Sequence, residues 1–391
     1  MRRFGKWLGR ALVLVVLAGA AFLTFGPGYV EAQRNAVTPH DPWPVSDAAA
    51  ALHDTLIIGD WHADSLLWNR DLTKRGNRGQ VDLPRLIDGN VALQMFTAVT
   101  KSPKGQNYDH NSADSGDNIT TLVMAQLWPP RTWDSLLERA LYQAERLHGF
   151  ETDAPEMLKI IRNRADLEEV LTRRAAGEDV VGGLLGVEGA HPLEGDLANL
   201  DKLVDAGYRM IALQHFFDNE LGGSLHGTGD HGLSEFGRAV VQDVAARPLI
   251  IDVAHSSPQV ARDVLALTDV PIVVSHTGLH SACAVKRNFP DDLMREIAAT
   301  GGVIAIGYWA DVTCDATPAG IASVIRQAIA ALGEDHVSLG SDFDGSVTTR
   351  FDTSELAALT HALLTEGVSE GQIRKVMGDN MLRVLRARLG D

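Results

Sequence analysis

The chain has 391 residues, enough for one large α/β barrel or for two or three ordinary domains. Its composition, 45% hydrophobic and 22% charged residues, is typical of a globular protein and excludes a chain that is mainly disordered. The 51 Asp and Glu residues outnumber the 35 Lys and Arg residues, which gives a net charge of -16. Such a surface repels a phosphate backbone, so the composition argues against nucleic acid as a partner.

The first segment, residues 1–32, has the pattern of an export signal. Basic residues precede an uncharged apolar run from Ala11 to Val30. Val30 and Ala32 stand where small residues precede a signal-peptidase cut, yet about 20 apolar residues also suffice to span a bilayer. A cleaved signal peptide and an uncleaved anchor therefore both remain open. In either case we expect a periplasmic or extracellular protein that meets the membrane only through this segment.

After a Pro-containing linker over residues 33–44, short aliphatic runs alternate with stretches of helical periodicity. Eight such runs are predicted as strands: 55–59, 91–97, 183–187, 210–214, 249–253, 272–275, 303–307 and 337–340. Helical patterns are clear over 318–332, 354–364 and 370–389. Eight strands that each lead to a helix predict one (β/α)8 TIM barrel over residues 45–391. An open doubly wound sheet would more often have fewer strands and a glycine-rich phosphate loop, which this sequence lacks.

Histidines and carboxylates follow these predicted strands in a regular way. They are His62 and Asp64 after the first strand, Glu188 after the third, His215 after the fourth, His255 after the fifth, His276 after the sixth, and Asp342 and Asp344 after the eighth. Because the carboxyl ends of barrel strands meet at one face, these side chains are expected to converge. Of the other histidines, His226 lies in a loop without a ligand pattern, and His191 is interpreted as supporting or structural.

Imidazole and carboxylate groups together suit zinc, and they outnumber the ligands of one tetrahedral ion. His62 and Asp64 are two residues apart on an extended segment, so both can reach one ion. His255 and His276, on adjacent strands, can hold a second ion, and Glu188 can bridge the two. We therefore expect two zinc ions per chain that share a water molecule, the nucleophile.

The chain resembles the zinc-dependent membrane dipeptidases, also called renal dipeptidases, with their bacterial members. The resemblance covers nearly the whole exported part, in the segments GDWHADSLLW, GVEGAHPLEG, DVAHSSPQVARDVL, PIVVSHTGLHSACAVKRNFPDDL, HVSLGSDFDG and IRKVMGDNMLRVL. It implies a barrel of the metal-dependent hydrolase type with two zinc ions. By motif, His62 and Asp64 would bind one ion, His255 and His276 the other, and Glu188 both.

The resemblance also implies roles for residues outside the ligand set. His215 matches a histidine that contacts the substrate and stabilises the tetrahedral intermediate, Arg287 an arginine of substrate binding, and Asp342 an acid that moves the proton. Cys283 and Cys314 resemble a disulfide pair of animal members; counting cysteines alone leaves a single bridge or two free thiols open.

The sequence departs from the family pattern near the expected substrate opening. Trp61 and Ala63 flank the first histidine, FFDN follows His215, and a long polar insertion, residues 101–118, follows the second strand. This insertion is expected either to overhang the site or to be mobile. Substrate preference is therefore less closely specified than metal chemistry.

The expected activity is hydrolysis of dipeptides by attack of a metal-bridging hydroxide on the peptide carbonyl. His215 would stabilise the oxyanion, Asp342 would carry the proton, and Arg287 would bind the free carboxylate of the substrate. Two alternatives remain open. One is a binuclear hydrolase of N-acyl amino acids, β-lactams or lactones, and the other is an inactive exported binding protein. The intact set of metal ligands argues against the second. The sequence leaves a homodimer open.

Overall fold

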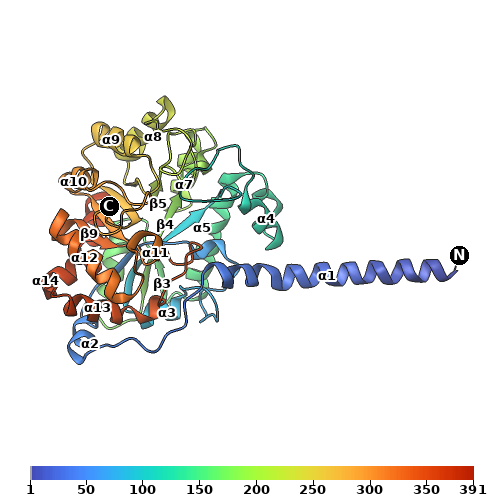
Figure 1. Ribbon diagram of the computed structural model, residues 1–391, viewed down its shortest axis with the longest axis horizontal. Helices are drawn as coiled ribbons and strands as arrows, with labels where there is room; N and C mark the ends of the chain where they lie inside the picture. The colour runs from blue at the N-terminus through green and yellow to red at the C-terminus, as the bar shows by residue number, and fades with distance from the viewer. Residues whose placement is uncertain (1) are drawn as a thin grey trace.

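A closed barrel of parallel strands, surrounded by helices, forms the body of the protein in a computed structural model that describes residues 2–391 (Figure 1). The strands are β1 (Ile58–Ala63), β2 (Val91–Val99), β4 (Val181–Glu188), β5 (Tyr208–Ala212), β6 (Ile250–Asp252), β7 (Ile272–Thr277), β8 (Val303–Ile306) and β9 (Val337–Leu339). They pair in the order β2-β1-β9-β8-β7-β6-β5-β4, and pairing of β2 with β4 closes the ring. This confirms the (β/α)8 barrel.

A ninth strand, β3 (Leu158–Ile160), pairs only with β4 on the outside of the ring and was not predicted. The eight barrel strands are buried at every position except Arg209 of β5, which explains why their sequences are aliphatic runs with almost no alternation. Glycine-rich β4 lies between β2 and β5, and its Gly186 leaves room for the side chains of Met95 and Met210. Its last residue, Glu188, is paired in register with Val99.

Two strands differ from their predicted limits in a way that affects the site. The sequence predicts the first strand over 55–59, but residues 54–56 are in hydrogen-bonded turns that follow α2 (Asp47–His53), and β1 continues to Ala63. Likewise β7 continues to Thr277. His62 and His276 therefore lie within strands rather than after them.

The outer layer consists of helices, most of which connect consecutive strands, while α13, α14 and α15 follow the last strand. Their bounds are α3 (Leu83–Asp88), α4 (Asn118–Ala125), α5 (Leu136–Asp153), α6 (Arg164–Ala175), α7 (Ala198–Asp205), α8 (Glu235–Ala246), α9 (Pro258–Leu267), α10 (Asp291–Ala299), α11 (Ala310–Thr313), α12 (Pro318–Leu332), α13 (Ala357–Thr365), α14 (Glu370–Arg374) and α15 (Asn380–Arg388). Helix α12 has the predicted limits. Thr317 caps it by accepting a hydrogen bond from the backbone N–H of Gly320, and Pro318 occupies its first position.

The sequence predicts one continuous helix over residues 370–389, but the structure has three elements there. A π-helical turn over Lys375–Asp379 separates α14 from α15. At this turn the backbone of Gly378 lies directly against β1, since a Cβ on Gly378 would be 1.7 Å from the Ile57 carbonyl oxygen. The close approach requires glycine and explains why the regular helix is interrupted there.

Helix α1 (Arg2–Arg34) leaves the barrel as a single long rod with the N-terminus at its far end (Figure 1). Its part from Arg10 to Arg34 is long and apolar enough to cross a membrane, judged by length and composition. The helix continues past residue 32, where the sequence places the end of the export segment. Beyond it, Val37 forms a β-bridge with Thr349, so this stretch runs along the barrel.

Cys283 and Cys314 form a disulfide bond with their Cα atoms 5.6 Å apart. The bond joins the loop after β7 to the end of α11, which follows β8. Both loops leave the carboxyl ends of barrel strands, and the first of them carries Arg287. The disulfide therefore fixes two neighbouring loops at the face where the predicted site residues lie.

Candidate active site

Glu188 lies at the centre of a cluster of buried imidazoles. Its Oε1 atom is 3.4 Å from His62 Nε2, 3.2 Å from His255 Nε2 and 3.4 Å from His276 Nε2. Its other oxygen, Oε2, is 3.2 Å from His215 Nε2. Four histidines from different strands thus face the two oxygens of one carboxylate. The structure brings together the residues that the sequence singled out.

His62 and Asp64 form one side of this cluster. His62 Nε2 is 3.4 Å from Asp64 Oδ1, and Thr97 Oγ1 donates a hydrogen bond of 2.5 Å to that same oxygen. Although carboxylate oxygens surround it, His62 Nε2 makes no aligned hydrogen bond, and it is fully buried. Polar atoms that converge without hydrogen-bond alignment are expected where a metal ion joins them.

His255 and His276 form the other side, with their Nε2 atoms 2.9 Å apart. Burial lowers the pKa of both rings well below the usual value, and the positive charge of Arg287 lowers it further. Both imidazoles are therefore neutral, as ligands of a divalent cation must be. Together with Glu188 they can hold a second ion.

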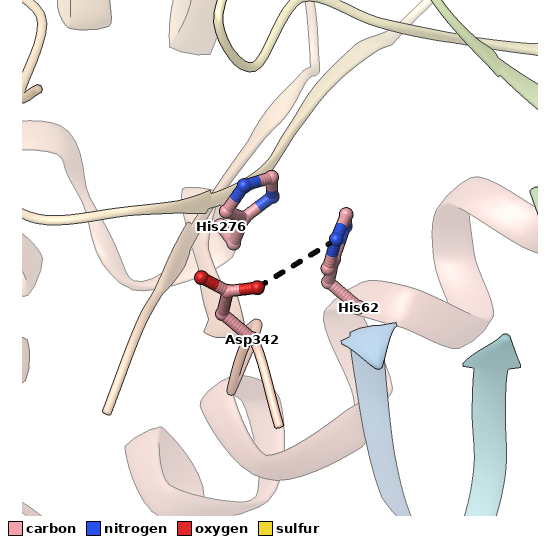
Figure 2. A group of neighbouring side chains, drawn as sticks. All are labelled: His62, His276 and Asp342. Carbon is pink, nitrogen blue, oxygen red and sulfur yellow. Dashed lines mark ion pairs between the residues drawn. The ribbon is translucent and has the colours of Figure 1, made fainter. Parts of the chain in front are cut away.

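Asp342 follows β9 and faces the first histidine. Its Oδ1 atom is 3.9 Å from His62 Nε2, and Figure 2 shows its carboxylate turned toward His62, with His276 beside it. Burial raises the pKa of Asp342 well above its usual value; the carboxylates of Asp64 and Glu188 add to this rise, and His62 offsets part of it. Asp344, two residues further on, points away and accepts a hydrogen bond of 2.7 Å from Ser65 Oγ.

A supporting network behind the histidines was not predicted. Ser275 Oγ donates a hydrogen bond of 2.5 Å to Asp252 Oδ2 and lies 2.9 Å from His276 Nδ1. Because the hydroxyl proton goes to Asp252, Ser275 accepts from the Nδ1–H of His276, which leaves Nε2 as the lone-pair atom. Asp60 likewise accepts a 2.8 Å hydrogen bond from the backbone of His62. The sequence does contain a sign of this network, since Asp60 and Asp252 are carboxylates within otherwise aliphatic strands.

Two of the functional residues have a left-handed backbone. His255 has φ 63° and Asp342 has φ 57°. Non-glycine residues rarely adopt this conformation, and a typical cost is about 1–3 kcal/mol each. The fold holds both, for example by a 2.7 Å hydrogen bond from the Leu225 N–H to the His255 carbonyl. Strain of this kind indicates positions held for function rather than for packing.

Arg287 is buried at the wall of a cavity above Glu188. Its Nη2 atom donates a hydrogen bond of 2.7 Å to the His276 carbonyl, and its guanidinium lies 5.9 Å from the ring centroid of Trp309. Its Nε–H has no hydrogen-bond partner. A buried cation with an unused donor, facing a cavity that Glu188 and Asp342 also line, is suited to bind an anionic group.

The insertion after β2 extends over this cavity, so of the two expectations for it the overhanging position is the one observed. Tyr108 of the insertion lines the cavity, and its hydroxyl accepts a 3.1 Å hydrogen bond from Trp309 Nε1. The Tyr108 ring packs on Phe216 and His226, at 5.6 and 5.4 Å between centroids. Burial lowers the pKa of His226 to about 3, so this histidine is neutral. No sequence pattern indicates Tyr108 or His226, because their positions depend on the path of an aperiodic loop.

The family model for membrane dipeptidases, peptidase family M19, matches residues 46–389. The chain belongs to this family. It is therefore a metal-dependent dipeptidase, and the resemblance seen in the sequence is confirmed.

Individual relatives agree with this assignment. The dipeptidase aclJ of Aspergillus oryzae is 28% identical over 353 residues, which cover 84% of this chain and 77% of the relative. The crystal structure of dipeptidase AC, a metallopeptidase of family M19, superposes with a TM-score of 0.70 at 25% identity, over 86% of this chain and all of that one (100%). A metallopeptidase from Rhodobacter sphaeroides, liganded with a phosphinate mimic of L-Ala-D-Ala, has the same fold at 23% identity, with a TM-score of 0.68 and coverage of 85% and 99%.

Proposed function

We propose that this dipeptidase is a binuclear zinc enzyme. His62 and Asp64 hold one ion, His255 and His276 hold the other, and Glu188 binds both. The observation that carries the proposal is the position of Glu188, with one oxygen within 3.4 Å of the Nε2 atoms of His62, His255 and His276. Imidazoles together with carboxylates are a donor set that fits zinc. Two zinc ions held there would polarise the peptide carbonyl and make water nucleophilic at neutral pH.

His215 is placed to bind the oxygen of the attacked carbonyl. Its Nδ1 atom lies 3.1 Å from the Lys101 carbonyl, which only accepts, so Nδ1 carries a proton. This contact turns Nε2 toward Glu188 and the cavity. In its imidazolium form, with a proton on both ring nitrogens, His215 would donate a hydrogen bond from Nε2 to the carbonyl oxygen as negative charge develops on it.

Asp342 is the group placed to move the proton. It lines the cavity, and its Oδ1 atom lies 3.9 Å from His62 Nε2. A carboxylate there can take a proton from the attacking water and return it to the departing amine. Its backbone, held in the left-handed conformation, fixes the direction of this carboxylate.

Arg287 sets the length of the substrate. A guanidinium forms paired hydrogen bonds with a carboxylate, and Arg287, whose Nε–H has no hydrogen-bond partner, lines the cavity next to the cluster. The C-terminal carboxylate of a dipeptide, one residue beyond the scissile bond, would reach it. A longer peptide would place an uncharged amide there and leave the buried cation unpaired.

The test is turnover of dipeptides by protein of known metal content, with L-Ala-D-Ala as the first probe because a mimic of it binds a structural relative. We expect two zinc ions per chain, with Glu188→Ala or His255→Ala losing both metal and turnover. Full turnover at zero or one equivalent of zinc would contradict the proposal. A panel of N-acyl amino acids, β-lactams and lactones, assayed in parallel, separates a dipeptidase from other amide and ester hydrolases.

A further inference from the structure

The C-terminal end of α1 is built into the barrel. Glu31, on this helix, is only 1% exposed, and it forms ion pairs with Arg70 and, at 2.6 Å, with Arg78. Arg70 in turn forms an ion pair with Asp344. Removing one member of such a buried set leaves an unpaired charge, which is strongly unfavourable. Glu31 is therefore part of the folded barrel, although it lies before the expected cut after Ala32.

The residues after α1 continue this attachment at the loop that follows β9. Asn35 Oδ1 accepts a 2.8 Å hydrogen bond from the Ser346 N–H. The backbones of Ala36 and Thr38 exchange hydrogen bonds of 3.0 and 2.9 Å with Thr349. This is the loop that begins with Asp342 and lines the cavity. The helix end thus supports the loop of the active site from behind.

The rest of α1 is apolar and exposed. Side chains such as Leu14 and Phe22 are more than 60% exposed, at 67% and 63%. The 25 residues from Arg10 to Arg34 span about 37 Å as a helix, more than the roughly 30 Å of a bilayer core. Phe25 and Tyr29, at 72% and 68% exposed, lie near the barrel end of the helix, where aromatic side chains mark a membrane interface.

A second apolar surface lies beside the helix on the barrel. Helix α4 contacts α1, and Figure 1 shows it next to the point where α1 leaves the barrel. Met124 of α4 is 42% exposed, and Leu127, just after it, is 68% exposed with a left-handed φ of 57°. Outside α1, few large apolar side chains of the described residues are this exposed, and these two share the side of the barrel that α1 leaves.

We propose that α1 is retained as a membrane anchor that docks into the barrel through Glu31, and that Met124 and Leu127 rest on the lipid surface. The occupant of this apolar surface is the bilayer itself, because the exposed helix beside it crosses that bilayer. The docked helix then holds the active-site loops at a fixed short distance from the membrane, whereas a flexible linker would let the barrel move freely.

The first experiment is the intact mass of the mature protein and its distribution between membrane and soluble fractions, in a host that exports the full chain. We expect a chain that still contains residues 11–32 and that stays in the membrane fraction after a high-salt wash. A mature chain that begins at Gln33 and is found in the soluble fraction would overturn the proposal. This measurement does not depend on any variant.

The second experiment tests the docking of the helix in detergent-solubilised full-length protein. Glu31→Ala is compared with Gln33→Ala, an exposed neighbour on the same helix. Loss of a buried ion pair should lower the unfolding midpoint of the first variant by about 4–7 °C, while the control stays at the wild-type value. Equal midpoints for the two variants would show that the helix end is not part of the barrel.

The third experiment tests contact with lipid. The native cysteines are paired, so a single new cysteine can be labelled with a fluorophore. In nanodiscs that contain nitroxide-labelled lipid, a probe at Leu127→Cys should be quenched. A probe at Ile57→Cys, which replaces a residue 37% exposed at the opposite end of the barrel, should not. Equal quenching at both positions would overturn the placement of this surface on the membrane.

Discussion

At the scale of single residues, Arg287 provides the most direct test of substrate binding. Replacing it with alanine should lower kcat/KM for free dipeptides roughly 30- to 150-fold, the equivalent of about 2–3 kcal/mol for charged hydrogen bonds. The loss should fall mainly on KM. Steady-state kinetics at equal zinc content measure it.

The control for this prediction is a second substrate rather than a second enzyme variant. A C-terminally amidated dipeptide lacks the carboxylate, so the wild-type enzyme should handle it poorly and Arg287→Ala should lower its turnover little further. Arg287→Lys keeps the charge but loses the planar fork, and an intermediate KM is expected. A loss for the amide as large as for the free dipeptide would argue against a carboxylate site.

Ser275 links His276, one of the proposed zinc ligands, to Asp252 and gives a second residue-scale prediction. Ser275→Ala removes the acceptor that holds the Nδ1–H of His276, 2.9 Å away, so zinc affinity should fall about 10- to 100-fold. Competition with a chelator measures this. Ser338→Ala is the matched control, because Ser338 is a fully buried serine on a barrel strand whose hydroxyl has no hydrogen-bond partner. Equal zinc affinity in the two variants would refute the supporting role.

The ligand residues could be proposed from sequence, whereas the groups behind and above them could not. His62, Glu188 and His276 occur at the ends of recognisable strands, so the topology of a barrel brings them together whatever the loops do. Asp252 also lies at a strand end, but nothing in the sequence says that its partner is Ser275 on the next strand. That pairing depends on rotamers and on strand register, which local patterns do not specify.

At the scale of elements, the insertion of residues 101–118 is the part of the fold most closely tied to substrate preference. Tyr108 reaches across the cavity to Trp309 and packs on Phe216. Tyr108→Ala should open the cavity and raise KM for small dipeptides several-fold, while larger side chains become better tolerated. Tyr108→Phe keeps the ring and should change KM little. Kinetics over a dipeptide library check both.

Lys104 provides the control within the same loop, since its side chain is exposed and away from the cavity. Lys104→Ala should leave the order of preferred dipeptides unchanged. If Tyr108→Ala and Lys104→Ala gave the same profile, the loop would cover the site without shaping its specificity.

The limits of helices and strands show which features local sequence patterns predict and which they do not. Helix α12 has the predicted limits because a threonine cap, a proline at the first position and a glycine after Leu332 all mark them. The first strand was placed three residues too early, because Thr55 and Leu56 have strand-like side chains but lie in turns after α2. Local sequence patterns do not predict the π-helical turn at Gly378, since its cause is contact with a strand more than 300 residues away in the chain.

At the scale of the whole molecule, the disulfide links the stability of the barrel to the geometry of its active-site face. The bond closes a loop with a sequence separation of 31 residues, and chain entropy predicts a contribution of about 3–4 kcal/mol to the free energy of unfolding. Replacing Cys283 and Cys314 together with alanine should lower that free energy by this amount. Urea denaturation, with an unchanged slope, measures it.

The same double variant should also weaken substrate binding before it weakens metal binding. Cys283 lies four residues before Arg287 on one loop, whereas the residues that we propose as zinc ligands lie on strands or within three residues of a strand end. Loosening the loop therefore moves the guanidinium more than the ligands. We expect a raised KM with unchanged zinc content, and wild-type protein treated with a reductant should behave likewise. Loss of zinc at an unchanged KM would show instead that the disulfide stabilises the metal centre rather than the substrate loop.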